Sequence, residues 1–391
     1  MGFYFSTYLG KLNGTGGFDE VDAFDDDYLA DKDKKQHLNL SEPAWLIVDQ
    51  DIKNFYLNEK EETKSGFFNR ILKNFYETSK ASINIRCENK REELKKVFNA
   101  KTFASFDGEM KETFIEKYLE VYKKELKDKA LSYPKGHGEK FRINVENVQL
   151  LKDEINEEEY YDDTIGLYLK ALYEEYCEKQ NFEREQIFFK DIMDEISMAI
   201  NESKKLKLAI KEKYNPKTKS FYTRRYLVSP YKIVQDDTKS YNYLIGLAEE
   251  IKEDGTTKEK KVSSFRISRI DKIKKMSSMG GFISKENKDK IEDELIHKKA
   301  QFMVGDIIDV KVRFTRKGIE SFKRQLYLRP QFYEKSKTED CVYTFKCTEV
   351  QAINYFFKFA RDVEVLEPQV LREKFIKRYS EALDNYKLDE E

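Results

Sequence analysis

The stretch between residues 229 and 276 constrains the fold of this chain most, because its apolar residues occur in short runs separated by turn-forming residues. One run is centred on Leu244 and Ile245, and another extends from Phe265 to Ile273. Short runs bounded by proline, aspartate and glycine are typical of β-strands. We therefore expect a small twisted sheet or barrel in this part of the chain.

Cationic and aromatic residues are interleaved with those apolar runs. Because neighbouring residues of a strand point to opposite faces, Arg266 leaves the face that Phe265 and Ile267 occupy. Single-stranded nucleic acid is bound by aromatic rings that stack on bases and by cations that contact phosphates, and arginine can do both. The nucleic-acid-binding residues that this pattern predicts are Arg224, Arg225, Tyr231, Tyr241, Tyr243, Arg266 and Arg269. The alternative is that some of these tyrosines, Tyr243 among them, fill the core.

Three segments of this stretch resemble a known family. Pro230, the tripeptide Asn242-Tyr243-Leu244 and the segment FRISRI at residues 265–270 look like the WYL domain, an Sm-like β-barrel found in bacterial regulators and CRISPR-associated proteins. The family is named after a Trp-Tyr-Leu tripeptide, and Asn242 stands at its first position here. The resemblance implies a regulatory or binding domain in the middle of the chain.

Composition indicates several domains with uneven charge. A chain of 391 residues is longer than a typical single domain, so about two to four domains are expected. Aromatic residues make up 14% of the sequence, which is too much for a disordered chain. The net charge is only -1, but residues 201–290 hold 23 Lys and Arg against 12 Asp and Glu, a balance of +11. Residues 18–31, by contrast, contain seven acidic residues and no basic ones.

The sequence lacks the patterns of catalytic and metal-binding sites. The four cysteines form no CxxC pair, so neither a zinc site nor a disulfide framework is predicted, and a reducing compartment is expected. The histidines, His37, His137 and His297, are far apart, and no hydrolase, P-loop or metalloenzyme motif occurs. We expect no catalytic residue, no metal and no cofactor. No apolar run reaches the roughly 20 residues of a membrane span, so a cytoplasmic protein without a membrane partner is expected.

The N-terminal segment predicts an arm followed by a strand and two helices. Residues 1–34 combine a glycine cluster with the acidic run and are expected to form the arm. Leu38 and Leu40 then alternate with polar residues as in a half-buried strand. Apolar residues at three- and four-residue spacing predict two helices, one after Ser41 and one starting near Thr63.

One strand followed by two helices resembles the ribbon-helix-helix unit, a DNA-binding module that pairs two strands into a ribbon. The resemblance implies that outward strand residues contact bases and that the start of the second helix contacts a phosphate. The residues at these positions, which form a possible second nucleic-acid contact, are Lys35, His37, Asn39 and Lys64. The alternative is that His37 and Asn39 are only solvated.

A ribbon-helix-helix fold needs a second strand and a second pair of helices. Residues 138–180 repeat the pattern of residues 35–80, with Arg142 to Val145 aligned on His37 to Leu40. We therefore expect two half-units in one chain, separated by a helical insertion. The apolar positions of the insertion are Phe114, Tyr118, Val121 and Leu126. The second half-unit is acidic, which weakens the case for DNA binding and leaves a scaffold or a protein-binding surface as alternatives.

The last 90 or so residues alternate strands and helices and resemble the ferredoxin-like extension that accompanies many WYL domains and often mediates dimers. The chain is thus expected to be an α+β multidomain protein. The predicted domains are an arm at 1–34, a ribbon-helix-helix-like domain at 35–180 with half-units 35–80 and 138–180 and a helical insertion at 81–135, a linker helix at 181–203, an Sm-like or SH3-like WYL β-barrel at 204–300, and a ferredoxin-like WCX-type dimerisation domain at 301–391.

This combination of domains resembles the WYL-domain accessory proteins of type VI-D CRISPR systems. The resemblance implies a non-enzymatic homodimer, active in antiviral defence, that binds single-stranded RNA and raises the activity of the RNA-guided RNase, the effector of such systems. The alternative is a DNA-binding transcription regulator whose WYL domain senses a ligand. A protein adaptor is a third class, but it would not need the basic cluster at residues 201–290.

Overall fold

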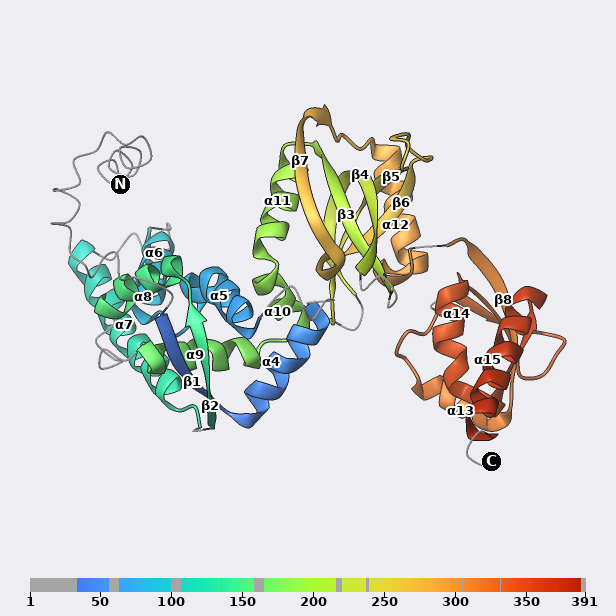
Figure 1. Ribbon diagram of the computed structural model, residues 1–391, viewed down its shortest axis with the longest axis horizontal. Coiled ribbons are helices and arrows are strands. Elements are labelled where there is room, and N and C mark those ends of the chain that lie inside the picture. The colour runs from blue at the N-terminus through green and yellow to red at the C-terminus, as the bar shows by residue number, and fades with distance from the viewer. Residues whose placement is uncertain are drawn as a thin grey trace. The chain divides into compact units, whose positions relative to one another are not determined.

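A computed structural model of the chain describes residues 34–55, 63–99, 107–134, 136–157, 165–215, 220–236, 239–303, 305–330 and 332–387. The chain divides into two compact units, residues 1–179 and 180–391 (Figure 1). Both contain helices and sheets, so the α+β multidomain class predicted from the sequence holds at this level. The predicted N-terminal arm lies outside the described residues except for Lys34, which begins the first strand.

The first unit is built from a two-stranded ribbon and helices (Figure 1). Its elements, with η for a 3₁₀ turn, are β1 (Lys34–Leu40), α4 (Glu42–Phe55), α5 (Lys64–Phe75), η1 (Tyr76–Thr78), α6 (Ile83–Phe98), α7 (Gly108–Leu131), β2 (His137–Ile143), α8 (Val145–Glu157) and α9 (Ile165–Glu178). Strand β1 pairs antiparallel with β2, with Lys35 opposite Arg142 and His37 opposite Lys140. The two predicted half-units therefore meet through their strands, although a ribbon-helix-helix assignment stays a prediction.

Helix starts in this unit follow from capping side chains. The Ala44 N–H donates to the Ser41 hydroxyl at 3.4 Å, and the Gly66 N–H donates to the Thr63 hydroxyl at 3.2 Å. Both helix starts expected from the sequence are confirmed. The second strand, in contrast, ends at Ile143 rather than extending to Val145, because the Asn144 side chain accepts from the Asn147 N–H at 3.0 Å and begins a helix instead.

The predicted inner face of the insertion is partly wrong. Leu126 is buried in α7, but Phe114, Tyr118 and Val121 are exposed. The buried positions next to them are Ile115 and Leu119. Since adjacent residues of a helix point about 100° apart, a helix with two neighbouring apolar stripes can bury either one, and the spacing alone does not decide which.

The second unit begins with two helices and a five-stranded sheet. In chain order they are α10 (Asn181–Phe188), α11 (Lys190–Asn201), β3 (Lys204–Asn215), β4 (Ser220–Gln235), β5 (Asn242–Ile251), β6 (Lys261–Arg266), η4 (Ile267–Arg269), β7 (Ile270–Gly280), α12 (Lys285–Lys298) and η5 (Ala300–Phe302). The predicted linker helix is therefore two helices, with the break at Phe189.

The strand order of this sheet is β6-β5-β4-β3-β7, and all neighbours are antiparallel. In the part of the chain that the structure describes, β6 and β7 do not pair with each other, so the closed barrel expected from the sequence is not found. The physical reason is that η4 turns the chain directly after the short strand β6, and β7 then pairs with β3. The finer Sm-like or SH3-like assignment stays a prediction.

Close packing shapes the centre of the sheet. Ile245 and Leu247 of β5 pack with Ile291 of α12 in a buried cluster, whereas α11 contacts β3, β4 and β7. A Cβ added at Gly246 would lie 2.3 Å from the Ser229 carbonyl oxygen, so only glycine fits where β5 crosses β4.

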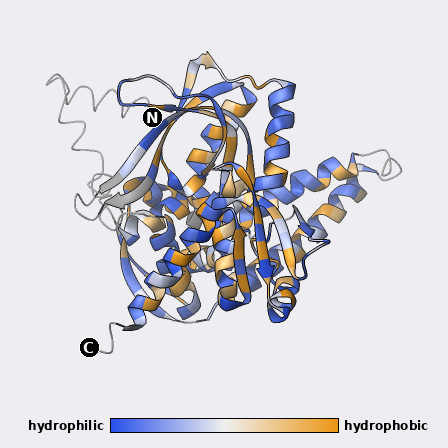
Figure 2. Cartoon of the chain, turned by 90° about the vertical axis from the view of Figure 1, so that its right-hand side faces the viewer, coloured by the Kyte–Doolittle hydropathy of each residue, from blue (hydrophilic) through white to orange (hydrophobic). Residues whose placement is uncertain are grey.

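The C-terminal part of this unit forms a second sheet. Its elements are β8 (Ile307–Phe314), α13 (Arg316–Arg324), β9 (Phe332–Lys335), β10 (Val342–Thr348), α14 (Glu349–Phe356), η6 (Phe357–Asp362), β11 (Val363–Glu367) and α15 (Gln369–Lys387). The sheet order is β11-β8-β10-β9. The order of strands and helices is the one that the ferredoxin-like prediction requires. Along the helices, hydrophobic residues recur between hydrophilic ones (Figure 2).

Candidate nucleic-acid interface

The cluster with the strongest binding chemistry lies where β5 starts and β6 ends. Tyr243 of β5 is directly opposite Arg266 of β6 in the antiparallel register. The Arg266 guanidinium carbon lies 3.2 Å from the centroid of the Tyr241 ring. This is a stacked cation–π contact, and such contacts are worth about 0.5–2 kcal/mol, depending on desolvation.

Arg266 is held in this position by two further groups. Its Nε donates to the Ser268 hydroxyl at 2.6 Å and lies 4.0 Å from a carboxylate oxygen of Glu185. The Arg266 side chain is 20% exposed, so it is partly accessible to solvent. Within the described residues, its terminal amino groups have no hydrogen-bond partner and are available for a ligand.

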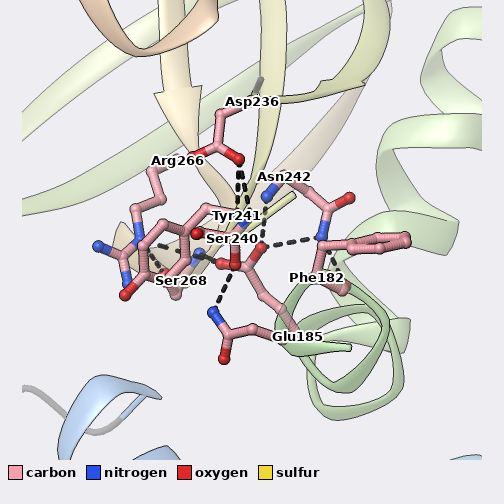
Figure 3. A network of polar contacts seen from close by, with 9 residues as sticks. Phe182, Glu185, Asp236, Ser240, Tyr241, Asn242, Arg266 and Ser268 are labelled. Carbon is pink, nitrogen blue, oxygen red and sulfur yellow. Dashed lines mark hydrogen bonds and ion pairs between the residues drawn. The ribbon is translucent and has the colours of Figure 1, made fainter. Parts of the chain in front are cut away.

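Glu185 of α10 organises the polar network around Arg266 (Figure 3). Its carboxylate accepts hydrogen bonds from the backbone N–H of Asn242 at 2.5 Å and from the Asn242 side-chain amide at 2.9 Å. It also accepts from the Ser268 N–H at 3.2 Å. Burial raises the pKa of Glu185, although the hydrogen bonds from Asn242 and Ser268 and the charge of Arg266 act in the opposite direction.

Asn242, at the first position of the tripeptide, is completely buried. Its amide donates to the Phe182 carbonyl at 2.8 Å, and its side-chain oxygen accepts from Gln186 at 3.1 Å. A buried amide is stable only when its donors and acceptor are satisfied. Glu185 was not among the residues predicted from the sequence. The signal that could have found it is the polar residue at position 242, together with Glu185 and Gln186 in the preceding helix.

The turn between β4 and β5 fixes the backbone of Tyr241. The Asp236 carboxylate accepts from the N–H groups of Ser240 at 2.7 Å and Tyr241 at 3.3 Å (Figure 3). The Asn181 side chain in turn donates to the Ser240 carbonyl. Tyr241 therefore projects from a braced turn, which restricts the positions that its ring can take.

Arg269 and Tyr243 complete the cluster. Arg269 is half-buried, and burial, reinforced by the charge of Arg266, lowers its pKa. Tyr243 packs partly against the buried cluster below α12, and burial raises its pKa to about 12, with a further contribution from the Asp236 charge. The predicted residues that the structure brings together are thus Tyr241, Tyr243, Arg266 and Arg269, with Tyr243 shared between the core and the surface.

Three predicted residues lie elsewhere on the sheet. Arg225 is opposite Ile251, at the far end of β5 from Tyr243, a separation of about eight residues or roughly 27 Å. Arg224 lies next to it and 3.9 Å from a Glu250 oxygen. Tyr231 packs against α12. These residues do not join the cluster around Arg266.

Tyr231 has its own local partners. The Lys232 and Lys288 ammonium groups lie 5.4 and 5.9 Å from its ring centroid. A hydrogen bond to Glu292 raises the pKa of the Tyr231 phenol. The ring is therefore engaged by neighbouring side chains of β4 and α12.

The residues of the second predicted nucleic-acid contact, in the first unit, mostly contact other groups of the protein. The Lys64 ammonium group is bound to both carboxylate oxygens of Glu139 at 2.9 Å and lies 3.4 Å from Asp49. Asn39 accepts from the Gly136 N–H at 2.9 Å, and the His37 ring lies against the Gly138 backbone. Of the four residues that the sequence named, these three have structural partners.

Lys35 belongs to a cationic ribbon face that the sequence analysis only partly identified. A cleft of about 620 Å³ is lined by Lys35 of β1 and by Lys140 and Arg142 of β2, together with hydroxyl and amide side chains. No acidic residue is among those that line it. Lys140 and Arg142 were missed because the acidic residues after position 145 dominated the interpretation of the second half-unit.

The described segments contain neither a metal site nor a membrane span. No group of three or more His, Cys, Asp or Glu residues in them could hold a metal ion. Every helix described is too short or too polar to cross a lipid bilayer.

Comparisons with known proteins agree with the architecture. Residues 306–383 match the model of the WCX domain. A solved structure described as a CRISPR Cas-related protein matches with 25% sequence identity and a TM-score of 0.68, covering 92% of this chain and 96% of that chain. The chain resembles a WYL-domain, CRISPR-associated protein. The resemblance to WYL-domain and CRISPR-associated proteins, expected from the sequence, is thereby confirmed.

Two further comparisons do not bear on the fold or the function. The proteasome accessory factor B/C (PafBC) of Arthrobacter aurescens matches with 16% identity over 65% of this chain and 39% of that chain, at a TM-score of 0.26, which is too low to support a shared fold. No curated protein matches the chain.

Proposed function

We propose that this chain is a non-catalytic accessory protein that binds single-stranded RNA and raises the activity of the RNA-guided RNase of a type VI-D CRISPR system. The observation that supports RNA binding is the stack of Arg266 on Tyr241, in which the guanidinium carbon lies 3.2 Å from the ring centroid. The second arginine, Arg269, lies beside this stack. Cations and aromatic faces in one cluster are what single-stranded nucleic acid requires.

The stack leaves a defined place for a base. One face of the Tyr241 ring is covered by Arg266, so a base can stack on the outer plane of the guanidinium or on the opposite face of the ring. The terminal amino groups of Arg266 can then donate to a phosphate, as planar guanidinium groups commonly do. Glu185 keeps the guanidinium in place but neutralises part of its charge.

The accessory role is supported by similarity. The matching solved structure is described as CRISPR Cas-related and aligns over nearly the whole length of both chains. We further propose that the C-terminal domain pairs two copies of the chain, and that the protein acts in antiviral defence. The stimulation of an RNase requires contact with the effector, with the RNA, or with both.

A cleavage assay tests this function directly. A type VI-D effector loaded with guide RNA is assayed on target RNA with and without the full chain, alongside a titration of the chain with labelled oligouridine at several salt concentrations. We expect faster cleavage with the chain, and RNA affinity that falls between roughly 50 and 200 mM salt. Unchanged cleavage together with no RNA binding would contradict the proposal.

A second candidate function is favoured by the ribbon. Lys35, Lys140 and Arg142 project from neighbouring positions of an antiparallel ribbon and line a cleft without acidic side chains. A two-stranded ribbon of this kind fits the major groove of duplex DNA. A DNA-binding transcription regulator, with the WYL-like domain sensing a ligand, is therefore the alternative, and tighter binding to duplex DNA than to oligouridine would favour it.

A further inference from the structure

A basic and aromatic surface lies in the C-terminal domain, outside every site described above. Residues 316–329 contain five Lys and Arg residues and only one acidic residue, Glu320. We call the surface formed by Arg324, Tyr327, Arg329, Tyr333 and Lys358 the α13 surface, because it surrounds the end of that helix. This segment was not predicted from the sequence, because the acidic residues in the rest of the domain offset its local excess of positive charge.

The cations of the α13 surface are not neutralised by the fold. Among the residues that the structure describes, Arg324, Arg329 and Lys358 have no carboxylate oxygen within 4.0 Å. On strand β8 of the same domain, in contrast, Lys311 and Arg313 are paired with Glu339 at 2.7 and 3.5 Å. A cation without an internal carboxylate partner remains available to an external anion, although burial lowers the pKa of Lys358.

Lys358 and Tyr327 form one half of the α13 surface. The Lys358 ammonium group lies 5.0 Å from the centroid of the Tyr327 ring and donates to the Tyr327 carbonyl at 3.3 Å. It also lies 5.2 Å from the ring of Tyr355, whose hydroxyl donates to the Gln325 carbonyl at 2.8 Å. These contacts hold the loop after α13 against η6.

Arg329 and Tyr333 form the other half. The Arg329 guanidinium lies 5.3 Å from the centroid of the buried Phe322 ring. Phe322 meets Tyr333 edge-on at 5.3 Å and Tyr355 at 6.4 Å. Phe322 and Tyr355 are buried, so they connect the two halves through the core beneath the surface.

The turn that presents Tyr327 has an unusual backbone. Leu328 has a φ of 61°, which is rare for leucine, and the Arg329 N–H closes the turn on the Leu326 carbonyl at 3.2 Å. As a result Leu328 packs against the core, while Leu326 and Tyr327 remain 65% and 57% exposed. Strain of this kind persists where the surrounding structure imposes it, and it is often found at functional sites.

We propose that the α13 surface is a second contact site for single-stranded RNA, separate from the cluster around Arg266. This second site rests on the proposed RNA-binding function and extends it to a second domain. Exposed tyrosine rings next to unpaired cations bind unstacked bases and phosphates, whereas bases inside a duplex are not accessible to such rings. Two contact sites on one chain bind a long strand more tightly than either site alone.

The first test is a titration of the full chain with oligouridine. Tyr327→Ala is expected to weaken binding at least about fivefold, because stacking on an exposed ring is lost. Arg324→Ala is expected to reduce the slope of log affinity against log salt by about 0.7, the value for one lost phosphate contact. The matched controls are Tyr386→Ala and Arg378→Ala, which change exposed residues of α15 and are expected to leave both quantities unchanged.

The outcomes separate the two proposals. If the unmodified chain binds no RNA, the proposed function fails. If RNA binding responds to Tyr241→Leu but not to Tyr327→Ala and Arg324→Ala, the function stands and the α13 site is rejected. A change in oligomeric state without a change in RNA affinity would mean that the α13 surface binds protein, and would also reject it.

A second measurement does not depend on variants. The unmodified chain is photo-crosslinked to oligonucleotides that contain 4-thiouridine, and the crosslinked peptides are identified by mass spectrometry. Crosslinks to the peptide that contains Tyr327 support the proposal. Crosslinks confined to β5 and β6 overturn it.

Discussion

The carboxylate of Glu185 accepts a hydrogen bond of 2.5 Å from the backbone N–H of Asn242 and a second one, of 2.9 Å, from its side-chain amide. This pair joins α10 to the first residue of β5. The same carboxylate lies 4.0 Å from Arg266, so the stability of the domain and the position of the proposed RNA-binding arginine depend on one buried group.

Asn242→Ala is expected to lower the free energy of unfolding by about 1–3 kcal/mol, because it leaves Glu185 and the Phe182 carbonyl with fewer partners in a buried site. Urea unfolding measures the change. The control is Asn385→Ala, at an exposed position of α15, for which a change within about 0.5 kcal/mol is expected. Equal effects of the two substitutions would show that the hydrogen bonds between Asn242 and Glu185 contribute little to the free energy of unfolding.

Glu185→Gln is expected to alter the pH dependence of stability. Burial raises the pKa of Glu185 in the folded protein above the value of about 4.3 for an unfolded chain. Between these two pKa values the folded state binds more protons than the unfolded state, so this group makes the free energy of unfolding fall as pH rises. The stability of the variant relative to the unmodified chain should therefore increase from about pH 4 upward through the raised pKa. A difference that is constant with pH would contradict the assignment.

Gly246→Ala is expected to destabilise the second unit by about 1–3 kcal/mol, since the new methyl group would collide with the Ser229 carbonyl of β4. Gly280→Ala is the matched control, because nothing lies within 4 Å of a Cβ added there. Thermal or urea unfolding compares the two. Similar stability for both variants would mean that β4 and β5 can move apart at this crossing without cost.

Lys64→Ala is expected to leave nucleic-acid affinity and its salt dependence unchanged, whereas Arg142→Ala is expected to lower both. Lys64 is already bound to Glu139 and Asp49, and its side chain is 41% exposed, so the loss of these pairs should cost no more than about 1 kcal/mol. Arg142 lines the ribbon cleft. If Lys64→Ala lowered affinity more than Arg142→Ala, the cationic ribbon face would not be the surface that binds nucleic acid.

Local patterns predicted local structure well. The strand around Leu38 and Leu40 and the helix starts at Ser41 and Thr63 were predictable, because alternation and capping depend on neighbouring residues. These features need no knowledge of distant contacts.

Features that depend on distant contacts were not predictable in the same way. Phe114 could not be distinguished from the adjacent Ile115 as the buried residue of α7, because only the neighbouring helices decide which stripe packs. The pairing of Lys64 with Glu139 joins residues 75 positions apart. Glu185 is separated from Asn242 by 57 positions, and only the fold reveals that it supports the candidate site.

The most direct measurement of the central claim is the affinity of the full chain for oligouridine after Arg266→Lys, compared with Arg225→Lys. Both substitutions preserve charge, but lysine cannot form the planar stack that Arg266 makes on Tyr241, whereas Arg225 is exposed at the distant end of the same sheet. We predict that Arg266→Lys weakens RNA binding at least about fivefold, with Arg225→Lys near the unmodified value. Equal affinities for the two variants, in a chain that binds RNA, would contradict the account.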